Sequence, residues 1–194
     1  HWCLLAANKG HPLAQHEVAL CYDYGRGVKV DHVKAAYWYT KAAENGVYIS
    51  QHNLAHSYYG GEGVNQSYEE AVRWFTKAAE NGYAESQYML GLCYSEGTGV
   101  SQDYDMALYW YSKSADQGYA KAQGNLAALY ASGHGQAVDT AAAIQLYEKA
   151  AAQGSSVAEL NLGLAYANGT GVAADFDLAC KWFRLSAEHG NKDA

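Results

Sequence analysis

The sequence is poor in proline and contains no cluster of basic residues, and each scarcity excludes a class of protein. Its 194 residues include a single proline, Pro12, whereas 49% of the residues are hydrophobic and alanine is frequent. This composition is not that of a disordered chain, and abundant alanine favours helices over strands. We therefore expect an all-helical protein.

Basic residues are outnumbered, with 13 Lys and Arg against 20 Asp and Glu and a formal net charge of −7. A protein that binds nucleic acid presents a basic face that neutralises phosphates, and an anionic membrane surface makes the same demand. No hydrophobic run approaches the roughly 20 residues of a membrane-spanning helix. We therefore expect neither a nucleic-acid partner nor insertion into a membrane.

The chain also lacks the short motifs of common enzymes and metal-binding modules. It contains no His-Glu-x-x-His or Gly-x-Ser-x-Gly sequence, and its cysteines and histidines have the spacing of no zinc module. The glycine-rich segments at 61–64 and 97–100 have neither the lysine nor the preceding strand of a phosphate-binding loop. We expect a protein that is not an enzyme and that needs no cofactor.

What the chain does contain is a period of 36 residues, repeated without insertion. The period relates a tyrosine, a glycine and a glycine pair in five successive copies: Tyr22, Tyr58, Tyr94, Tyr130 and Tyr166; Gly46, Gly82, Gly118, Gly154 and Gly190; Gly25/Gly27, Gly61/Gly63, Gly97/Gly99, Gly133/Gly135 and Gly169/Gly171. A fixed period of this length indicates one supersecondary unit stacked along an axis.

The period divides the chain into five full repeats and two fragments within a single continuous domain, 1–194. We place the partial repeat at 1–10, the full repeats at about 11–46, 47–82, 83–118, 119–154 and 155–190, and the start of another at 191–194. Because both ends cut through a repeat, we expect the chain to be a piece of a longer array. The compartment stays open, since an exported or periplasmic protein and a cytoplasmic one are equally compatible with this sequence.

Each repeat is predicted to form two helices, A and B. Helix A is expected at about 13–24, 49–60, 85–96, 121–132 and 157–168, and helix B at about 32–45, 68–81, 104–117, 140–153 and 176–189. Side chains suited to N-capping precede every helix B: Asp31, Ser67, Asp103, Asp139 and Asp175. The glycine pair is expected to end helix A, and the single glycine to follow helix B.

In the first full repeat, small, aromatic and glycine residues follow a fixed order: Ala14, Val18, Ala19, Tyr22, Gly25, Gly27, Val28, Asp31, Lys34, Ala35, Trp38, Tyr39, Lys41, Ala42, Ala43 and Gly46. This order resembles the Sel-one-like repeat (SLR), a relative of the tetratricopeptide repeat, over essentially the whole chain. The resemblance implies a right-handed α-solenoid of antiparallel helix pairs. It also implies a scaffold or adaptor, because similar proteins, bacterial ones among them, hold other proteins.

The fourth full repeat departs from the pattern. Leu146 takes the place of the tryptophan at Trp38, Trp74, Trp110 and Trp182, and Gln136 takes the place of a valine. Because the stability of a repeat array is roughly a sum of local contributions, we expect residues 121–153 to be its least stable part.

The four cysteines, Cys3, Cys21, Cys93 and Cys180, do not repeat as a disulfide framework would. Cys21 and Cys93 share a repeat position with Ser57, Leu129 and Ala165, which indicates small buried side chains. We expect free thiols, with a bridge between Cys3 and Cys21 as the one alternative left open.

Positions that vary between repeats form one stripe along helix A, next to its core face. In the first three full repeats this stripe includes His16, Leu20, Tyr24, His52, His56, Tyr59, Tyr88 and Leu92. The resemblance places helix A on the concave side of the superhelix, so we expect this stripe to line a groove. Exposed tyrosines are frequent at binding hot spots, and the stripe is our candidate partner site.

Two of these residues, His52 and His56, lie four apart and share one helix face, as pairs of metal ligands do. A polar, partly exposed surface is the interpretation we favour, and a transition-metal site is the alternative. We therefore expect no metal but retain His52 and His56 as candidate ligands.

A further column of helix A consists mostly of asparagine: Glu17, Asn53, Met89, Asn125 and Asn161. Asparagine both donates and accepts hydrogen bonds, so it could hold the backbone of a peptide, or it could join two helices. Both interpretations stay open for Asn53, Met89, Asn125 and Asn161. The adjacent glutamines, Gln15, Gln51, Gln87 and Gln123, are expected to join neighbouring repeats.

These observations predict a monomeric interaction scaffold that holds a protein segment or domain in the groove lined by helices A. The alternative is a protein that binds, and possibly hydrolyses, a small molecule or glycan through the histidine and tyrosine side chains of the first three full repeats.

Overall fold

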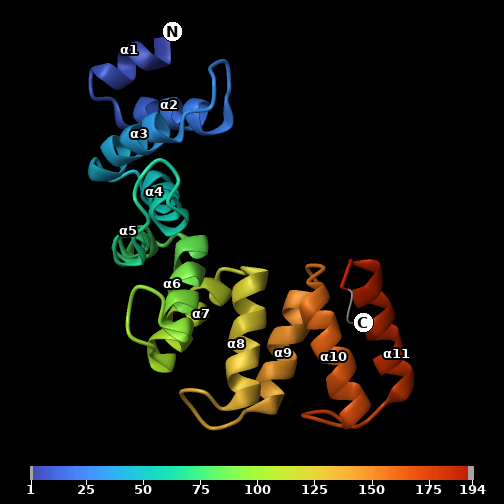
Figure 1. The fold of residues 1–194 in the computed structure, drawn as a ribbon. Coiled ribbons are helices and arrows are strands. Elements are labelled where there is room, and N and C mark those ends of the chain that lie inside the picture. Colours follow the sequence, from blue (N-terminus) through green and yellow to red (C-terminus); the bar gives the residue numbers. More distant parts are fainter. Residues whose placement is uncertain (1, 192–194) are drawn as a thin grey trace. The chain divides into compact units, whose positions relative to one another are not determined.

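The computed structural model describes residues 2–191, and this part of the chain contains helices and no strand. The helices, drawn in Figure 1, are α1 (Trp2–Asn8), α2 (Pro12–Tyr24), α3 (His32–Glu44), α4 (Tyr48–Gly60), α5 (Tyr68–Glu80), α6 (Ala84–Glu96), α7 (Tyr104–Asp116), α8 (Ala120–Ser132), α9 (Thr140–Ala151), α10 (Ser156–Asn168) and α11 (Phe176–Glu188). The prediction of an all-α fold of paired helices is confirmed. The expected start of a further repeat lies, except for Asn191, outside the described residues.

The chain divides into two compact units, His1–Gln102 and Asp103–Ala194. In the first, successive helices from α1 to α6 pack against one another, and in the second the same holds from α7 to α11. Within the described chain, no helix combines the length and the apolar character that crossing a membrane requires.

The helix ends lie where the sequence predicted them, within two residues. In every helix B, the capping side chain accepts a hydrogen bond from the backbone N–H three residues later, as Asp31 does from Lys34 at 3.0 Å. Helix A ends at the first glycine of the pair, which takes a left-handed conformation, as Gly25 does with φ of 69°. The helix ends depend on capping hydrogen bonds and glycine conformations within a few residues, so they can be predicted from the sequence.

The second glycine of the pair is needed for a different reason, which is its close contact with the preceding repeat. A Cβ atom at Gly63 would overlap the backbone carbonyl of His32, at the start of α3. At the same position of the next repeat, a Cβ on Gly99 would overlap the carbonyl of Tyr68. The turn can therefore approach the start of the preceding helix B only because no side chain intervenes.

The glutamine column joins helix A to the preceding helix B, as predicted. Each Nε2 donates to a backbone carbonyl eight residues earlier: Gln15 to Ala7 at 3.3 Å, Gln51 to Ala43 at 3.1 Å, Gln87 to Ala79 at 3.1 Å and Gln123 to Ala115 at 3.3 Å. All four glutamines are buried. The bond stabilises the stack because it satisfies a buried carbonyl near a helix end.

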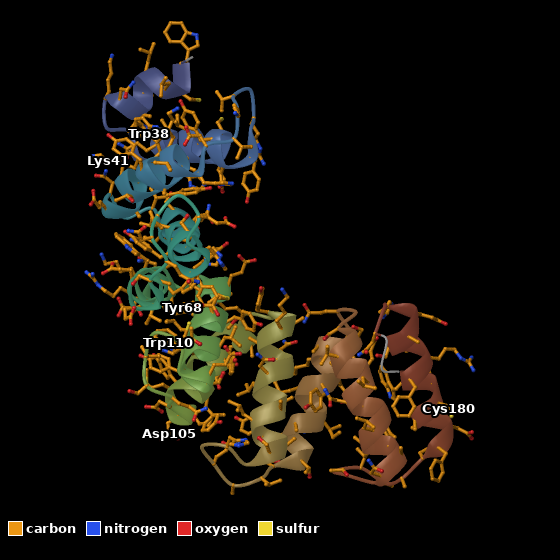
Figure 2. The ribbon with its side chains drawn as sticks, in the orientation of Figure 1. Trp38, Lys41, Tyr68, Asp105, Trp110 and Cys180 are labelled. Atoms are coloured by element: carbon orange, nitrogen blue, oxygen red, sulfur yellow. The ribbon has the colours of Figure 1, made fainter. Side chains whose placement is uncertain are left out.

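The cysteines are free, so the Cys3–Cys21 bridge does not form in this structure. Cys93 is buried, and burial raises the pKa of its thiol to about 11, which keeps it protonated and unreactive at neutral pH. Cys180, on α11, is exposed (Figure 2), and Cys3 is exposed as well. Of the two cysteines expected to be buried, Cys93 is buried and Cys21 is half-buried.

Candidate functional site

A polar groove of about 380 Å³ lies in the first compact unit. Its lining comes from α2, from α4 and the turn after it, and from the start of α6: Asp23, Tyr24, His52, Asn53, His56, Ser57, Glu62, Tyr83 and Glu85. We call these nine residues the acidic groove. The groove brings together Tyr24, His52 and His56 of the predicted stripe and Asn53 of the asparagine column.

The acidic groove takes its charge from carboxylates on successive repeats. Asp23 accepts a hydrogen bond from the Tyr39 hydroxyl at 3.0 Å, and Glu85 accepts one from the Tyr83 hydroxyl at 2.9 Å. Glu62 is exposed on the turn after α4. Among the described residues that line the groove, none is a lysine or arginine. The site therefore presents negative charge and hydrogen-bond acceptors to an incoming group.

His52 differs from the expectation of a partly exposed side chain, because only 6% of it is exposed. Its Nδ1 lies 2.8 Å from the Ser86 hydroxyl, and its Nε2 lies 3.5 Å from a carboxylate oxygen of Glu85. Burial, and to a lesser extent the neighbouring His56, lower the pKa of His52 to about 3. His52 is consequently neutral at physiological pH and joins α4 to α6.

The neighbouring repeat shows the same contact. His16 Nδ1 lies 2.8 Å from the Ser50 hydroxyl, and burial lowers the pKa of His16 as well. The histidine-to-serine hydrogen bond is therefore an element of repeat stacking, found at equivalent positions in two repeats.

The Ser86, His52 and Glu85 side chains resemble the order of groups in a hydrolytic triad, but their burial is wrong for that chemistry. Ser86 is completely buried, so a substrate cannot reach its hydroxyl. A histidine with a pKa of about 3 is also a poor general base near neutral pH. The arrangement offers no support for the hydrolytic alternative.

His56 is the more accessible of the two histidines in the groove. Its ring centroid lies 4.6 Å from that of His52 and 5.1 Å from that of Phe75. Partial burial against these rings lowers the pKa of His56, while Glu85 and Glu62 oppose the shift. The described part of the chain contains no group of three His, Cys, Asp or Glu side chains placed to hold a metal ion.

Part of the asparagine column pairs with a tyrosine column fourteen residues earlier. Asn125 Nδ2 donates to the Tyr111 hydroxyl at 3.0 Å, and the Asn53 side chain interacts with the equivalent Tyr39, where it opposes the burial that raises the pKa of that phenol. Where the tyrosine is replaced by Phe75, the asparagine is replaced by Met89. Asn125 thus joins α7 to α8, while a role of the asparagine column in binding a peptide stays a prediction; the paired replacement was visible in the sequence.

The remaining residues of the stripe do not line the acidic groove. Leu20 packs against the core cluster of Ala19, Ala35 and Tyr39. The Tyr59 ring lies 5.0 Å from the Tyr68 ring in an edge-to-face arrangement. Tyr88, Met89 and Leu92 are half-buried on α6, and Asn125 and Asn161 belong to the second compact unit.

Sequence reasoning did not recognise that Asp23, Glu62 and Glu85 form one acidic cluster, which is half of the site. Each occupies a position where the other repeats carry residues of different character; Glu62, for example, corresponds to Arg26, Thr98, His134 and Thr170. A search for like charges at such positions on neighbouring repeats would have found the cluster.

Comparisons with solved structures identify close relatives of this fold. The c5321 protein, a protective antigen present in uropathogenic Escherichia coli strains and displaying an SLR fold, is 39% identical, with a TM-score of 0.94 over 98% of this chain and 41% of its own. A Sel1 repeat protein from Oxalobacter formigenes is 36% identical, with a TM-score of 0.91 over 96% of this chain and 76% of its own. The chain thus spans less than half the length of the c5321 protein.

More distant structures share the fold alone, among them the immunity protein Pa5087 from Pseudomonas aeruginosa, which is 22% identical with a TM-score of 0.58 over 96% of this chain and 72% of its own. No curated protein matches the chain. The model of the Sel1 repeat matches five consecutive segments, 12–47, 49–83, 84–119, 120–155 and 156–191. Since these segments cover most of the sequence and follow its helix pairs, the chain belongs to the Sel1 repeat family.

Proposed function

We propose that the chain is an interaction scaffold that binds a basic segment of a protein partner in the acidic groove. The fold is typical of interaction scaffolds, and the family is mostly non-catalytic. The observation that carries the proposal is the convergence of Asp23, Glu62 and Glu85 on one groove without a lysine or arginine in its described lining. A lysine or arginine side chain of the partner would supply the missing opposite charge.

The three carboxylates differ in how many hydrogen bonds they already accept from the protein. Asp23 already accepts the Tyr39 hydroxyl and lies 3.0 Å from His32 Nδ1, so much of its acceptor capacity is used. Glu85 accepts only one protein hydroxyl, and Glu62 is exposed, so these two retain lone pairs for a guanidinium or ammonium group. Tyr24 and Tyr83 line the same groove, and the Tyr24 ring already attracts a cation, since the Arg26 guanidinium carbon lies 5.3 Å from its centroid.

The experiment compares two variants of equal charge. In the groove variant, Glu62→Gln is combined with Glu85→Gln; in the control, Glu44→Gln is combined with Glu80→Gln, at exposed ends of α3 and α5 outside the groove. Proteins captured from a lysate of the source organism are identified by cross-linking and mass spectrometry, and affinity for the captured partner is measured by calorimetry. We expect the groove variant to bind at least tenfold more weakly, and the control to bind as the unaltered protein does.

Equal binding by the two variants would contradict the proposal. Affinity should also fall as salt rises, because the contact is between charges at a partly exposed site. A neutral glycan or small molecule that stabilises the protein through this groove, with no protein partner captured, would favour the alternative of small-molecule binding.

A further inference from the structure

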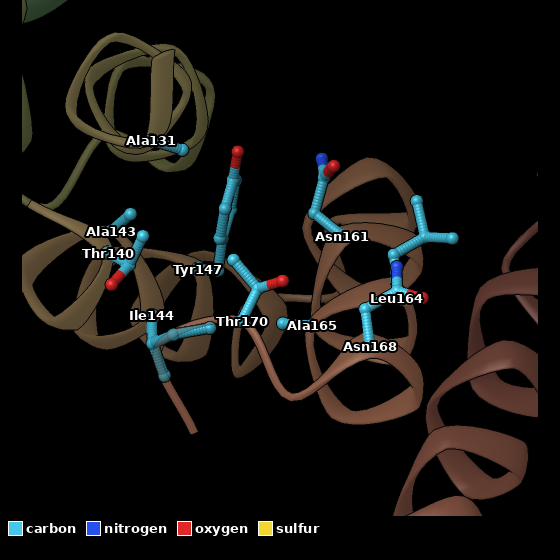
Figure 3. Close-up of a pocket in the computed structure, with 10 residues that line it drawn as sticks. All are labelled: Ala131, Thr140, Ala143, Ile144, Tyr147, Asn161, Leu164, Ala165, Asn168 and Thr170. Carbon is cyan, nitrogen blue, oxygen red and sulfur yellow. The ribbon is translucent and has the colours of Figure 1, made fainter. Parts of the chain in front are cut away.

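A second pocket, of about 160 Å³, lies within the second compact unit (Figure 3). It is formed by α8, α9, α10 and the turn after α10: Ala131, Thr140, Ala143, Ile144, Tyr147, Asn161, Leu164, Ala165, Asn168 and Thr170. None of these described residues carries a formal charge. We call this the Tyr147 pocket.

Tyr147 contributes a polar group that the fold leaves without a partner. Only 7% of the residue is exposed, and within residues 2–191 its hydroxyl has no hydrogen-bond partner. In Figure 3 the hydroxyl extends from α9 in the same direction as the amide of Asn161. The hydroxyl is not among the fully buried, unpartnered polar atoms of the described chain, so it is reachable from the pocket, and a ligand can replace solvent as its hydrogen-bond partner.

Comparison between repeats explains why the partner is absent. The equivalent Tyr39 donates to Asp23 at 3.0 Å, but the position of Asp23 is occupied by Ala131 in this repeat. The equivalent Tyr111 accepts from Asn125, but Asn161 donates instead to the carbonyl of Val157 at 2.9 Å. Both replacements leave the Tyr147 hydroxyl free, and Ala131 also leaves space beside it.

We propose that the Tyr147 pocket binds the side chain of a tyrosine presented by a protein partner, an inference that rests on the proposed scaffold function but uses a different site. A cavity of about 150 Å³ accommodates a benzene ring, so the pocket is large enough for one aromatic ring. Ala143, Ile144 and Ala165 offer the ring an apolar wall. The phenol oxygen of the incoming tyrosine would accept the hydrogen bond that Tyr147 does not otherwise make.

The chemistry of the lining disfavours charged and purely apolar occupants. A lysine, arginine or carboxylate side chain would lose its hydration without meeting an opposite charge. A leucine or phenylalanine side chain would fill the space but leave the Tyr147 hydroxyl unbonded. A phenol ring satisfies both the apolar wall and the hydroxyl.

The test is an NMR titration of the full chain with N-acetyl-tyrosine amide, and with p-cresol as the bare ring. We expect both probes to shift the backbone amides of residues around 131, 140–147 and 161–170. N-acetyl-phenylalanine amide and toluene should bind about fivefold more weakly, as the loss of one hydrogen bond implies.

Tyr147→Phe should weaken binding of both phenols about fivefold while leaving toluene binding unchanged. This variant should remain folded, because Phe75 occupies the equivalent position in another repeat. The matched control is Tyr111→Phe, which removes a buried hydroxyl of the same compact unit outside the pocket and should not alter binding. Ala131→Phe, at an exposed lining position, should obstruct the pocket and abolish the shifts.

Equal affinity of Tyr147→Phe and the unaltered protein for the phenols, or shifts outside the pocket, would overturn the proposal. Binding of p-cresol without N-acetyl-tyrosine amide would also overturn it, since the pocket would then admit a free small molecule but not a partner's side chain. The groove variant with Glu62→Gln and Glu85→Gln should bind the probes normally, so failure here is distinguishable from failure of the acidic groove.

Discussion

At the residue scale, His52 shows how strongly burial can alter one side chain. Its pKa of about 3 in the folded chain lies below the value of about 6.5 expected in the unfolded chain. Between these two values the unfolded state binds more protons, so stability falls as the pH drops from about 6.5 towards 3. Neutral His52 is thus a requirement of the folded state, set by its burial and by the neighbouring His56.

We predict that His52→Asn reduces the loss of stability between pH 7 and pH 5. A shift of one pKa unit corresponds to about 1.4 kcal/mol, so His52 accounts for up to about 2 kcal/mol of that loss. Urea unfolding at the two pH values measures it. The control is His11→Asn, at an exposed histidine outside the groove. An unchanged pH dependence in His52→Asn would show that other groups cause the acid sensitivity.

Gly63 and Gly82 are glycines for different reasons. Gly82 only needs a backbone conformation that other residues rarely adopt, whereas Gly63 needs that conformation and also lies close to the preceding repeat. Both have positive φ, 74° and 84°, but only at Gly63 would a Cβ overlap a neighbouring helix. We predict that Gly82→Ala costs about 1–2 kcal/mol, the strain of a left-handed alanine. Gly63→Ala should cost a further 1–3 kcal/mol or so, because the two repeats must separate. If chemical denaturation gives the same loss of stability for Gly63→Ala and Gly82→Ala, the close approach of the two repeats does not contribute.

At the scale of the element, the link between helix A and the preceding helix B changes in the last full repeat. Glu159 occupies the glutamine position, is 1% exposed, and its carboxylate lies 2.8 Å from His189 Nδ1. In the repeat before, Gln153 Nε2 donates to Gln123 Oε1 at 2.9 Å. A glutamate side chain lacks the amide N–H that its glutamine equivalents donate, so Glu159 does not make their bond.

We predict that Glu159→Gln combined with His189→Gln stabilises the α9–α10–α11 region by about 1 kcal/mol. The pair would reproduce Gln123 and Gln153, restore a donor to the Ala151 carbonyl, and remove a buried charge. Thermal unfolding provides the measurement. Glu159→Gln alone is the control. It should gain less stability than the double variant, because His189 then loses its carboxylate partner and finds only a weaker amide acceptor. A lower midpoint for the double variant would show that the Glu159–His189 pair is the more stable link.

Sequence predicted elements far better than it predicted the site, and the reason is the range of the interactions involved. N-caps and glycine ends act within four residues, so they appear directly in the sequence. The contact between His52 and Ser86 spans 34 residues, and spacing within one helix does not tell which neighbour covers a face. The stripe therefore included the buried His52, and the carboxylates of two helices and one turn, Asp23, Glu85 and Glu62, were not recognised as one groove.

At the scale of the whole molecule, repeat contacts are local, so stability can differ between neighbouring parts of the chain. The fourth full repeat carries Leu146 where four others carry tryptophan. A depression of about 450 Å³ borders Leu146, with Leu126, Tyr130 and Ala142 in its lining. The smaller side chain thus leaves an incompletely filled space between α8 and α9.

We predict that amides of residues 121–153 exchange with solvent faster than those of 156–188, because opening this part loses fewer buried contacts. Leu146→Trp should slow exchange there by filling the depression, while leaving α10 and α11 less affected. Glu148→Trp adds the same ring at an exposed position of α9 and should not slow exchange. Equal protection of 121–153 and 156–188 in the unaltered chain would sink the idea of a soft repeat, and faster exchange in Leu146→Trp would show that the depression is too small for the ring.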